Sequence, residues 1–259
     1  STRSVVFRTV PEIGMIPREA KLKVEVPAIK QSETVTVPLR ALFVPKAGKA
    51  ITIDGDLSDW QDVAPVVLTV KNSVQNTPWS DAMKKNTVEF RGKWSSDRLY
   101  LAIKVRKDGF HPVDTLGEGS TWQGDGIQFA LDTIANAPKG TAGYQDDDFE
   151  YSLSLYQGKP LLMRLAGSAS TYDSLPKPLG RTDQGDCAIR KTADGVVYEL
   201  ALPPVSISPF KLLPGSATRF NFIVNMNDGQ KRIGWIELTP GIGQQPKRPD
   251  QFMDMVLLP

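Results

Sequence analysis

Two residue types that build many catalytic and structural sites are almost missing from this chain of 259 residues, which has one cysteine, Cys187, and one histidine, His111. A single cysteine excludes an intramolecular disulfide and a cysteine-clustered zinc site. A single histidine makes His111 the base of any Ser-His-Asp or Cys-His arrangement, and no Gly-x-Ser-x-Gly nucleophile motif occurs in the chain. Histidine-based metal catalysis lacks ligands for the same reason.

Long apolar runs, clustered basic residues and nucleotide-binding glycine patterns are also missing. No apolar run approaches the roughly 20 residues that cross a bilayer, so we expect no membrane span. The 31 basic and 29 acidic residues are scattered along the chain and give a formal net charge of +2, so we expect no nucleic-acid partner. Walker and dinucleotide patterns are absent. Glycoside hydrolysis needs only two suitably spaced carboxylates and stays open, although no acidic pair stands out.

What the chain does contain is turns and alternating strands. Its 21 glycines and 20 prolines favour many turns, and about a dozen short stretches alternate apolar and polar residues, as 99–105 and 220–227 do. No segment of note has the period of a helix. This pattern predicts an all-β protein, an antiparallel two-sheet β-sandwich.

The first 49 residues differ in texture from the rest. Two short strands are expected at 21–26 and 33–37, each followed by a proline that confines it to a sheet edge or a strand end. The stretch 45–48 is the expected boundary. We therefore divide the chain into 1–49, an N-terminal β appendage or the tail of an upstream domain, and 50–259, the sandwich.

A candidate ligand site lies at 121–132, where Trp122 leads into an alternating strand. Ile127, Phe129 and Leu131 point to one face of this strand, whereas Gln128 points to the other. An aromatic ring with amide and carboxylate groups nearby suits a sugar. The alternative is that Trp122 caps the hydrophobic core.

Three further residues are candidates for ligand contact. Trp79 lies in the polar stretch 71–85 and either meets a ligand or anchors its loop on the surface. Asn225 belongs to a row of asparagines on one face of 220–227, which either lines a ligand groove or bonds a neighbouring loop. Arg232 begins the strand expected to pair with 220–227.

Three successive aspartates, Asp146, Asp147 and Asp148, stand at the entrance of a strand. They repel one another unless they are solvated or bind a cation, and oxygen-rich loops select a hard cation such as Ca²⁺. A solvated acidic loop is the alternative. Asp108 and Asp125 are further candidates that could converge on such a site.

Several segments together resemble the family 9 carbohydrate-binding modules and the related DOMON-like sandwiches. They are IDGDLSDW at 53–60, KWSSDRLYLAIKVRKD at 93–108, WQGDGIQFALD at 122–132, GYQDDD at 143–148, YELALP at 198–203, FNFIVNMND at 220–228 and Phe252. Each is short, but their order and spacing are fairly specific, and the likeness covers about 51–258. The resemblance implies a jelly-roll or immunoglobulin-like sandwich, a structural Ca²⁺ and sugar held between aromatic rings. It also implies a catalytic domain in the same parent chain of a bacterial protein, secreted or at the cell surface or in the periplasm.

By this resemblance, Trp122 matches the family's first platform tryptophan. Gln128 stands where a sugar-bonding glutamate is typical, and Asn225 where an amide reaches the sugar. The aspartates at 146–148 match acids of the calcium loop.

Besides Gln128 in place of glutamate, there are two departures from the family pattern. Ser152 stands where an arginine is expected, and the second sandwiching tryptophan is missing from 241–251. That loop offers Gln244, Gln245, Lys247 and Arg248 instead. Trp79 is the candidate substitute for the missing ring.

The function that these observations favour is a noncatalytic carbohydrate-binding module that binds a polysaccharide or oligosaccharide. One alternative is a structural or docking sandwich that has lost sugar binding. Another is a haem b-binding redox domain, because related sandwiches hold haem with methionine and histidine or lysine, and this chain has His111 and six methionines.

Overall fold

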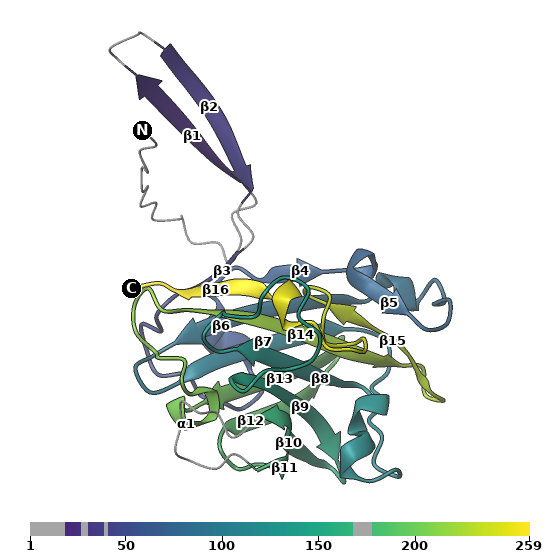
Figure 1. The fold of residues 1–259 in the computed structure, drawn as a ribbon. Coiled ribbons are helices and arrows are strands. Elements are labelled where there is room, and N and C mark those ends of the chain that lie inside the picture. The colour runs from purple at the N-terminus through teal and green to yellow at the C-terminus, as the bar shows by residue number, and fades with distance from the viewer. Residues whose placement is uncertain (1–18, 27–30, 39–40, 168–177) are drawn as a thin grey trace.

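The structure is a computed structural model that describes residues 19–26, 31–38, 41–167 and 178–259. Most of the described chain forms two mainly antiparallel β-sheets packed face to face, and a separate hairpin extends away from them (Figure 1). The predicted all-β two-sheet sandwich is therefore confirmed.

The smaller sheet has five strands in the order β12-β13-β7-β6-β4, and every neighbouring pair is antiparallel. Its strands are β4 (Val66–Leu68), β6 (Thr87–Trp94), β7 (Leu99–Arg106), β12 (Asp186–Thr192) and β13 (Gly195–Leu202).

The larger sheet has nine strands. Seven follow the order β11-β10-β9-β8-β14-β15-β5, and β16 pairs with both β14 and β3. The strands are β3 (Ala41–Val44), β5 (Ser73–Gln75), β8 (Gly126–Asp132), β9 (Asp148–Tyr156), β10 (Lys159–Gly167), β11 (Gly180–Arg181), β14 (Ala217–Asn227), β15 (Arg232–Glu237) and β16 (Met253–Leu257).

In the described parts of the chain, helical structure is limited to short turns between strands. These are η2 (Leu57–Trp60), η3 (Val70–Asn72), η4 (Met83–Lys85), η5 (Glu118–Gln123), η6 (Pro249–Gln251) and α1 (Pro204–Ile207). Among the described residues, none of the helices has the length and apolar character that a membrane span requires.

The core fills the space between the two sheets, because the alternating apolar side chains of both sheets point inward. Phe90 of β6 contacts Phe220 and Phe222 of β14, with ring centroids 5.5 Å and 4.9 Å away. Phe129 of β8 stacks on Tyr151 of β9 at 5.1 Å. Aromatic burial of this kind is the main contribution to the stability of such a core.

The boundary predicted at 45–48 falls inside the sandwich. β3 precedes it, pairs in parallel with β16, and contributes Leu42 and Val44 to the core as fully buried side chains. The two strands expected earlier in the chain are present as β1 (Glu19–Val26) and β2 (Gln31–Pro38), which pair antiparallel in a sheet of their own. A four-residue strand with little alternation is easily overlooked in sequence, because its pairing partner lies some 200 residues away.

We predict that Leu42→Ala lowers the free energy of unfolding by about 2–5 kcal/mol, because it leaves a cavity in a packed core. The matched control is Thr34→Ala in β2, an exposed position where a change within about 0.5 kcal/mol is expected. Urea denaturation followed by tryptophan fluorescence measures both. Equal midpoints for the two variants would show that β3 does not belong to the sandwich.

Candidate functional site

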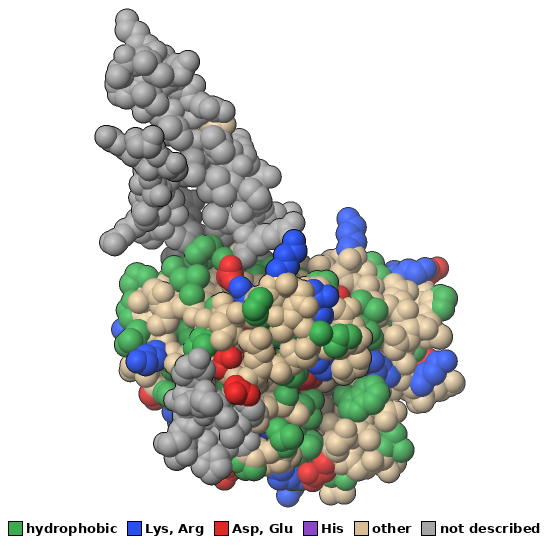
Figure 2. All heavy atoms as spheres, viewed as in Figure 1, with side chains coloured by type: hydrophobic (Ala, Val, Ile, Leu, Met, Phe, Trp, Pro, Cys, Tyr) green, Lys and Arg blue, Asp and Glu red, His purple; other side chains and the backbone are tan. Residues whose placement is uncertain are grey.

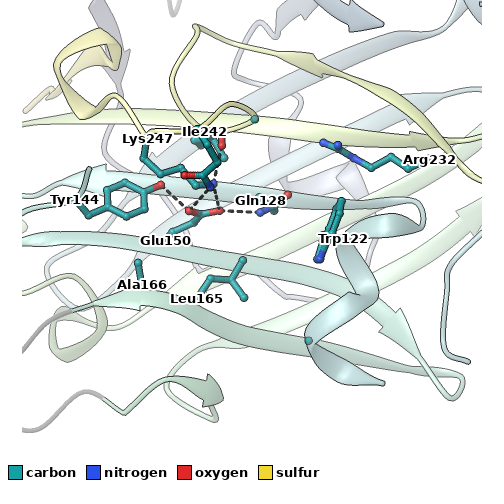
Figure 3. A pocket seen from close by; sticks show the side chains of 12 residues that line it. Trp122, Gln128, Tyr144, Glu150, Leu165, Ala166, Arg232, Ile242 and Lys247 are labelled. Atoms are coloured by element: carbon teal, nitrogen blue, oxygen red, sulfur yellow. Dashed lines mark hydrogen bonds and ion pairs between the residues drawn. The ribbon is translucent and has the colours of Figure 1, made fainter. Parts of the chain in front are cut away.

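A cleft of about 580 Å³ opens on the outer face of the nine-stranded sheet, the face turned away from the five-stranded sheet. Strands β8, β9, β10 and β15 form its base, and η5 and the loop 238–252 stand at its sides (Figure 3). It is lined by Gly119, Trp122, Gln128, Tyr144, Glu150, Leu165, Ala166, Arg232, Ile242, Gly243, Gln245 and Lys247.

Glu150 is the centre of the polar groups in this cleft. Its carboxylate accepts hydrogen bonds from Gln128 Nε2 and from the Tyr144 hydroxyl, each at 2.7 Å, and forms an ion pair with Lys247 Nζ at 3.1 Å. Burial and the neighbouring Glu150 charge raise the pKa of Tyr144 well above its ordinary value. Tyr144 is therefore a hydrogen-bond donor at any physiological pH.

The hydrogen bonds continue from Glu150 across three more strands. Asn225 Nδ2 donates to Gln128 Oε1 at 3.1 Å, and Arg232 Nε donates to Asn225 Oδ1 at 2.9 Å. The four residues come from β9, β8, β14 and β15, which are neighbours in the sheet. Alternation places all four side chains on the outer face, and we call this row the polar ladder.

At its far end the polar ladder meets two indole rings. Trp122 on η5 keeps 41% of its surface exposed, and the Arg232 guanidinium carbon lies 5.3 Å from its ring centroid. The same carbon lies 4.5 Å from the ring of Trp235. Burial lowers the pKa of Arg232 to about 10, so this side chain remains a cation at neutral pH.

A second, smaller apolar cluster supports the loop that borders the cleft. It lies on the outer face of the nine-stranded sheet and consists of Ala130, Ile223, Trp235, Ile242 and Phe252. Gly243 crosses the Trp235 indole so closely that a Cβ there would lie 2.2 Å from a ring atom. A residue without a side chain is needed at this point for the loop to lie against the sheet.

The segment that carries Trp122 is fixed from below by the buried ion pair of Lys107 and Asp125, whose closest atoms are 2.5 Å apart. The Asp125 carboxylate also accepts the backbone N–H groups of His111 and Asn227. At the end of η5, Asn227 Nδ2 donates to the Gln123 carbonyl at 2.9 Å. These bonds place the indole at the rim of the cleft.

The structure brings together three of the residues that the sequence singled out for ligand contact. Trp122, Gln128 and Arg232 line the cleft. Asn225 is 1% exposed and lies between Gln128 and Arg232, so it holds those two side chains in place beneath the cleft surface.

Trp79 lies elsewhere, and the interpretation of this residue as a ligand-contacting ring is wrong. Its side chain is 3% exposed and belongs to the core, where Nε1 donates to the Ile233 carbonyl at 3.1 Å. The polar sequence around it suggested an exposed loop, but the loop folds back onto β15. Trp79 therefore anchors its loop.

Sequence reasoning missed Glu150, Tyr144 and Ile242 as residues of the cleft, and noted Lys247 only as part of its loop. The signal for Glu150 was available, because strand alternation places it on the same face as Ser152 and opposite the core residues Phe149 and Tyr151. Its partner Gln128 lies diagonally across β8 and β9, where Glu150 pairs with Ala130.

An acidic cluster lies at the other end of β8. Oxygen atoms of Asp132, Asp147 and Asp148 all lie within 4.8 Å of one another, and all three residues are buried. Asp148 Oδ1 has no hydrogen-bond partner within the described segments. Burial, with the nearby Asp132 and Asp147 charges, raises the pKa of Asp148 to about 7.

The membership of this cluster differs from the set that the sequence suggested. Asp147 and Asp148 are in it, and Asp132 was missed, although β8 and β9 pair Asp132 directly with Asp148. Asp146 is exposed and outside the group, and Asp108 is exposed beside a different hollow near Lys191. Asp125, which was expected as a possible neighbour, is ion-paired with Lys107.

No protein-family profile and no curated protein sequence matches this chain. Solved structures do match. One is a family 9 carbohydrate-binding module from Caldicellulosiruptor kristjanssonii in complex with cellotriose, with 18% sequence identity and a TM-score of 0.62, covering 84% of this chain and 93% of that one.

This chain has the fold of a family 9 carbohydrate-binding module. A family 9 module from the same organism, in complex with glucose, has a TM-score of 0.59 and 18% identity, and the match covers 84% of this chain and 95% of that one. A protein from Bacteroides uniformis has a TM-score of 0.55 at 13% identity, and covers 84% of this chain and 99% of its own. The fold expected from the resemblance of short segments is thus confirmed.

We predict that Lys107→Met lowers the free energy of unfolding by about 3–5 kcal/mol, because it leaves the buried Asp125 charge without its cation. The control is Lys104→Met in β7, the strand that ends just before Lys107; its ion pair with Asp194 is partly exposed and contributes less than about 1 kcal/mol. Thermal unfolding followed by circular dichroism compares them. Similar melting temperatures for the two variants would contradict a special role for the buried pair.

Proposed function

We propose that the cleft binds a saccharide and that this chain is a noncatalytic carbohydrate-binding module. The observation that carries the proposal is the exposed indole of Trp122 beside the polar ladder. A pyranose ring has an apolar face of C–H groups and a rim of hydroxyls. The apolar face stacks on an exposed indole, and the hydroxyls form hydrogen bonds with donors and acceptors held in fixed positions.

The polar groups of the cleft suit hydroxyls because they offer both kinds of partner. Gln128 is 8% exposed and lines the cleft, and its amide keeps one N–H and one oxygen lone pair beyond the bonds it makes to Glu150 and Asn225. Lys247 Nζ keeps one N–H beyond its bonds to Glu150 and to the Ile242 carbonyl. A hydroxyl donates and accepts at once, so such a mixed surface binds it without leaving a group unpaired.

The fold supports the same class of ligand. Family 9 module structures in complex with cellotriose and with glucose share this architecture over 84% of the chain. The likeness in fold raises the expectation of sugar binding, and the cleft supplies the chemistry.

A binding role is favoured over hydrolysis by the content of the cleft. Glu150 is the one carboxylate among the described residues that line it, and it is already paired with Lys247 and bonded by Gln128 and Tyr144. Glycosidic bond hydrolysis normally uses two carboxylates about 5–10 Å apart.

A module that only binds would raise the effective concentration of a catalytic domain in the same parent chain near its polysaccharide. We accordingly expect the parent to be a secreted, periplasmic or cell-surface bacterial protein.

We further propose that Asp132, Asp147 and Asp148 hold a structural Ca²⁺. Their donor set fits a hard cation: three buried carboxylates lie together with one nearby arginine, Arg219, and no described residue is hydrogen-bonded to Asp148 Oδ1. A divalent cation would offset the repulsion among these carboxylates and supply the missing partner. It would fix the loop between β8 and β9, which carries the cleft residue Tyr144.

We expect Trp122→Ala to abolish retardation in affinity-gel electrophoresis on the glycans that retard the wild-type protein, because the sugar face loses the indole on which it stacks. Leu213→Ala, which removes another exposed apolar side chain, is the control and should migrate like the wild type. Wild-type protein that is retarded by no glycan in a broad panel, or unchanged retardation of Trp122→Ala, would count against the site and favour a docking sandwich.

Chelation by EDTA should lower the melting temperature of the protein, and added Ca²⁺ should restore it, since a ligand bound only by the folded state stabilises that state. Asp148→Asn should lose this response, whereas Asp146→Asn, at an exposed neighbouring position, should keep it. If both variants respond to Ca²⁺ as the wild type does, the ion is not held by this cluster.

A further inference from the structure

The charges in the cleft do not balance. Lys247 and Glu150 neutralise each other at 3.1 Å. Arg232 has no such partner, because no carboxylate lies within ion-pairing distance of it in the part of the chain that the structure describes. The side chains beside it on the polar ladder are the neutral amides of Asn225 and Gln128. The cleft therefore carries one uncompensated positive charge.

Arg232 is also held in a fixed orientation. Its guanidinium lies between the indoles of Trp122 and Trp235, at 5.3 Å and 4.5 Å, and its Nε is bonded to Asn225 Oδ1. Stacking on aromatic rings fixes the plane of a guanidinium. Among the described residues, no acceptor is hydrogen-bonded to the two terminal nitrogens of Arg232. These nitrogens form the edge of the guanidinium that binds a carboxylate through two parallel hydrogen bonds, and they are available to a ligand.

We propose that the saccharide this cleft recognises is acidic, and that Arg232 binds the carboxylate of a uronic acid residue. This inference rests on the proposed sugar-binding function. A uronic acid differs from the corresponding neutral hexose at C6, where a carboxylate replaces a hydroxymethyl group. Trp122 would be the platform for the sugar ring. The Arg232 guanidinium carbon lies over the same indole, 5.3 Å from its ring centroid (Figure 3), so it would meet the carboxylate of the same sugar unit.

A neutral sugar would bind in this cleft with lower affinity than an acidic one. It would displace water from a half-buried cation without supplying an opposite charge, and desolvating a charge without a partner is unfavourable. A uronate supplies that charge. Such a preference would arise locally, because the formal net charge of the chain is only +2, and basic and acidic side chains are interspersed on the face shown in Figure 2.

The test compares sugars that differ only at C6. Isothermal titration calorimetry with D-glucuronate against D-glucose, and D-galacturonate against D-galactose, measures the preference directly. Affinity gels with polygalacturonate and with its methyl ester extend the comparison to polymers. The variants are Arg232→Gln, Arg232→Lys and the control Lys231→Gln, which removes the same charge from an exposed neighbouring residue. Circular dichroism checks the fold of each variant.

The wild type should bind at least one acidic sugar about tenfold or more tightly than its neutral partner, as expected for a charge-assisted pair. Arg232→Gln should lose that preference, and Lys231→Gln should keep it. Arg232→Lys keeps the charge without the planar fork and should lose part of the preference. It also serves as the second variant if Arg232→Gln does not fold.

The other outcomes separate this inference from the proposed function. Equal or tighter binding of the neutral sugars, or an equal loss in Arg232→Gln and Lys231→Gln, would overturn the acidic preference while leaving the sugar-binding function in place. Wild-type protein that binds neither set, by calorimetry or in gels, would overturn both.

Discussion

The row of hydrogen bonds from Glu150 through Gln128 and Asn225 to Arg232 is the constraint on which the cleft depends. It crosses four neighbouring strands diagonally, because Glu150 pairs in register with Ala130, Gln128 with Ile223, and Arg232 with Asn227. Each side chain is hydrogen-bonded to the next, so four polar groups are held in place on the outer face of the sheet. A buried polar row of this kind is stable only when every member has a partner. It therefore fixes the positions of the groups that a ligand would meet.

Around this row, the outer face of the nine-stranded sheet is divided into a covered half and an open half. The loop 238–252 covers one half and packs Ile242 and Phe252 on Trp235 and Ile223. Over the other half the loop stops short, and the cleft remains between it and η5. The buried pair of Lys107 and Asp125 supports the η5 side. The cleft thus exists because two independently anchored segments border the same sheet face without meeting.

Local patterns predicted much of this arrangement. Alternation at 127–132 gave the core face of β8 and placed Gln128 opposite it, and the aromatic at 122 stands at the rim. The failures have a common cause. Trp79 was misjudged because the polarity of a loop does not show what its ring packs against. Asp132 and Glu150 were missed because the role of each depends on a partner in another strand. Asp132 meets Asp148, about 16 residues further along the chain, and Glu150 meets Gln128, 22 residues earlier.

The sequence by itself determined which residues face the core, where the strands run and that they form two sheets, because strand alternation and turn chemistry are local properties that can be read along the chain. The tertiary structure alone decided which polar residues meet. That choice depends on strand order and register, which bring Arg232 between Trp122 and Trp235 and gather Asp132 with Asp147 and Asp148. Register is set by the packing of the whole sheet, so no single segment of the sequence contains it.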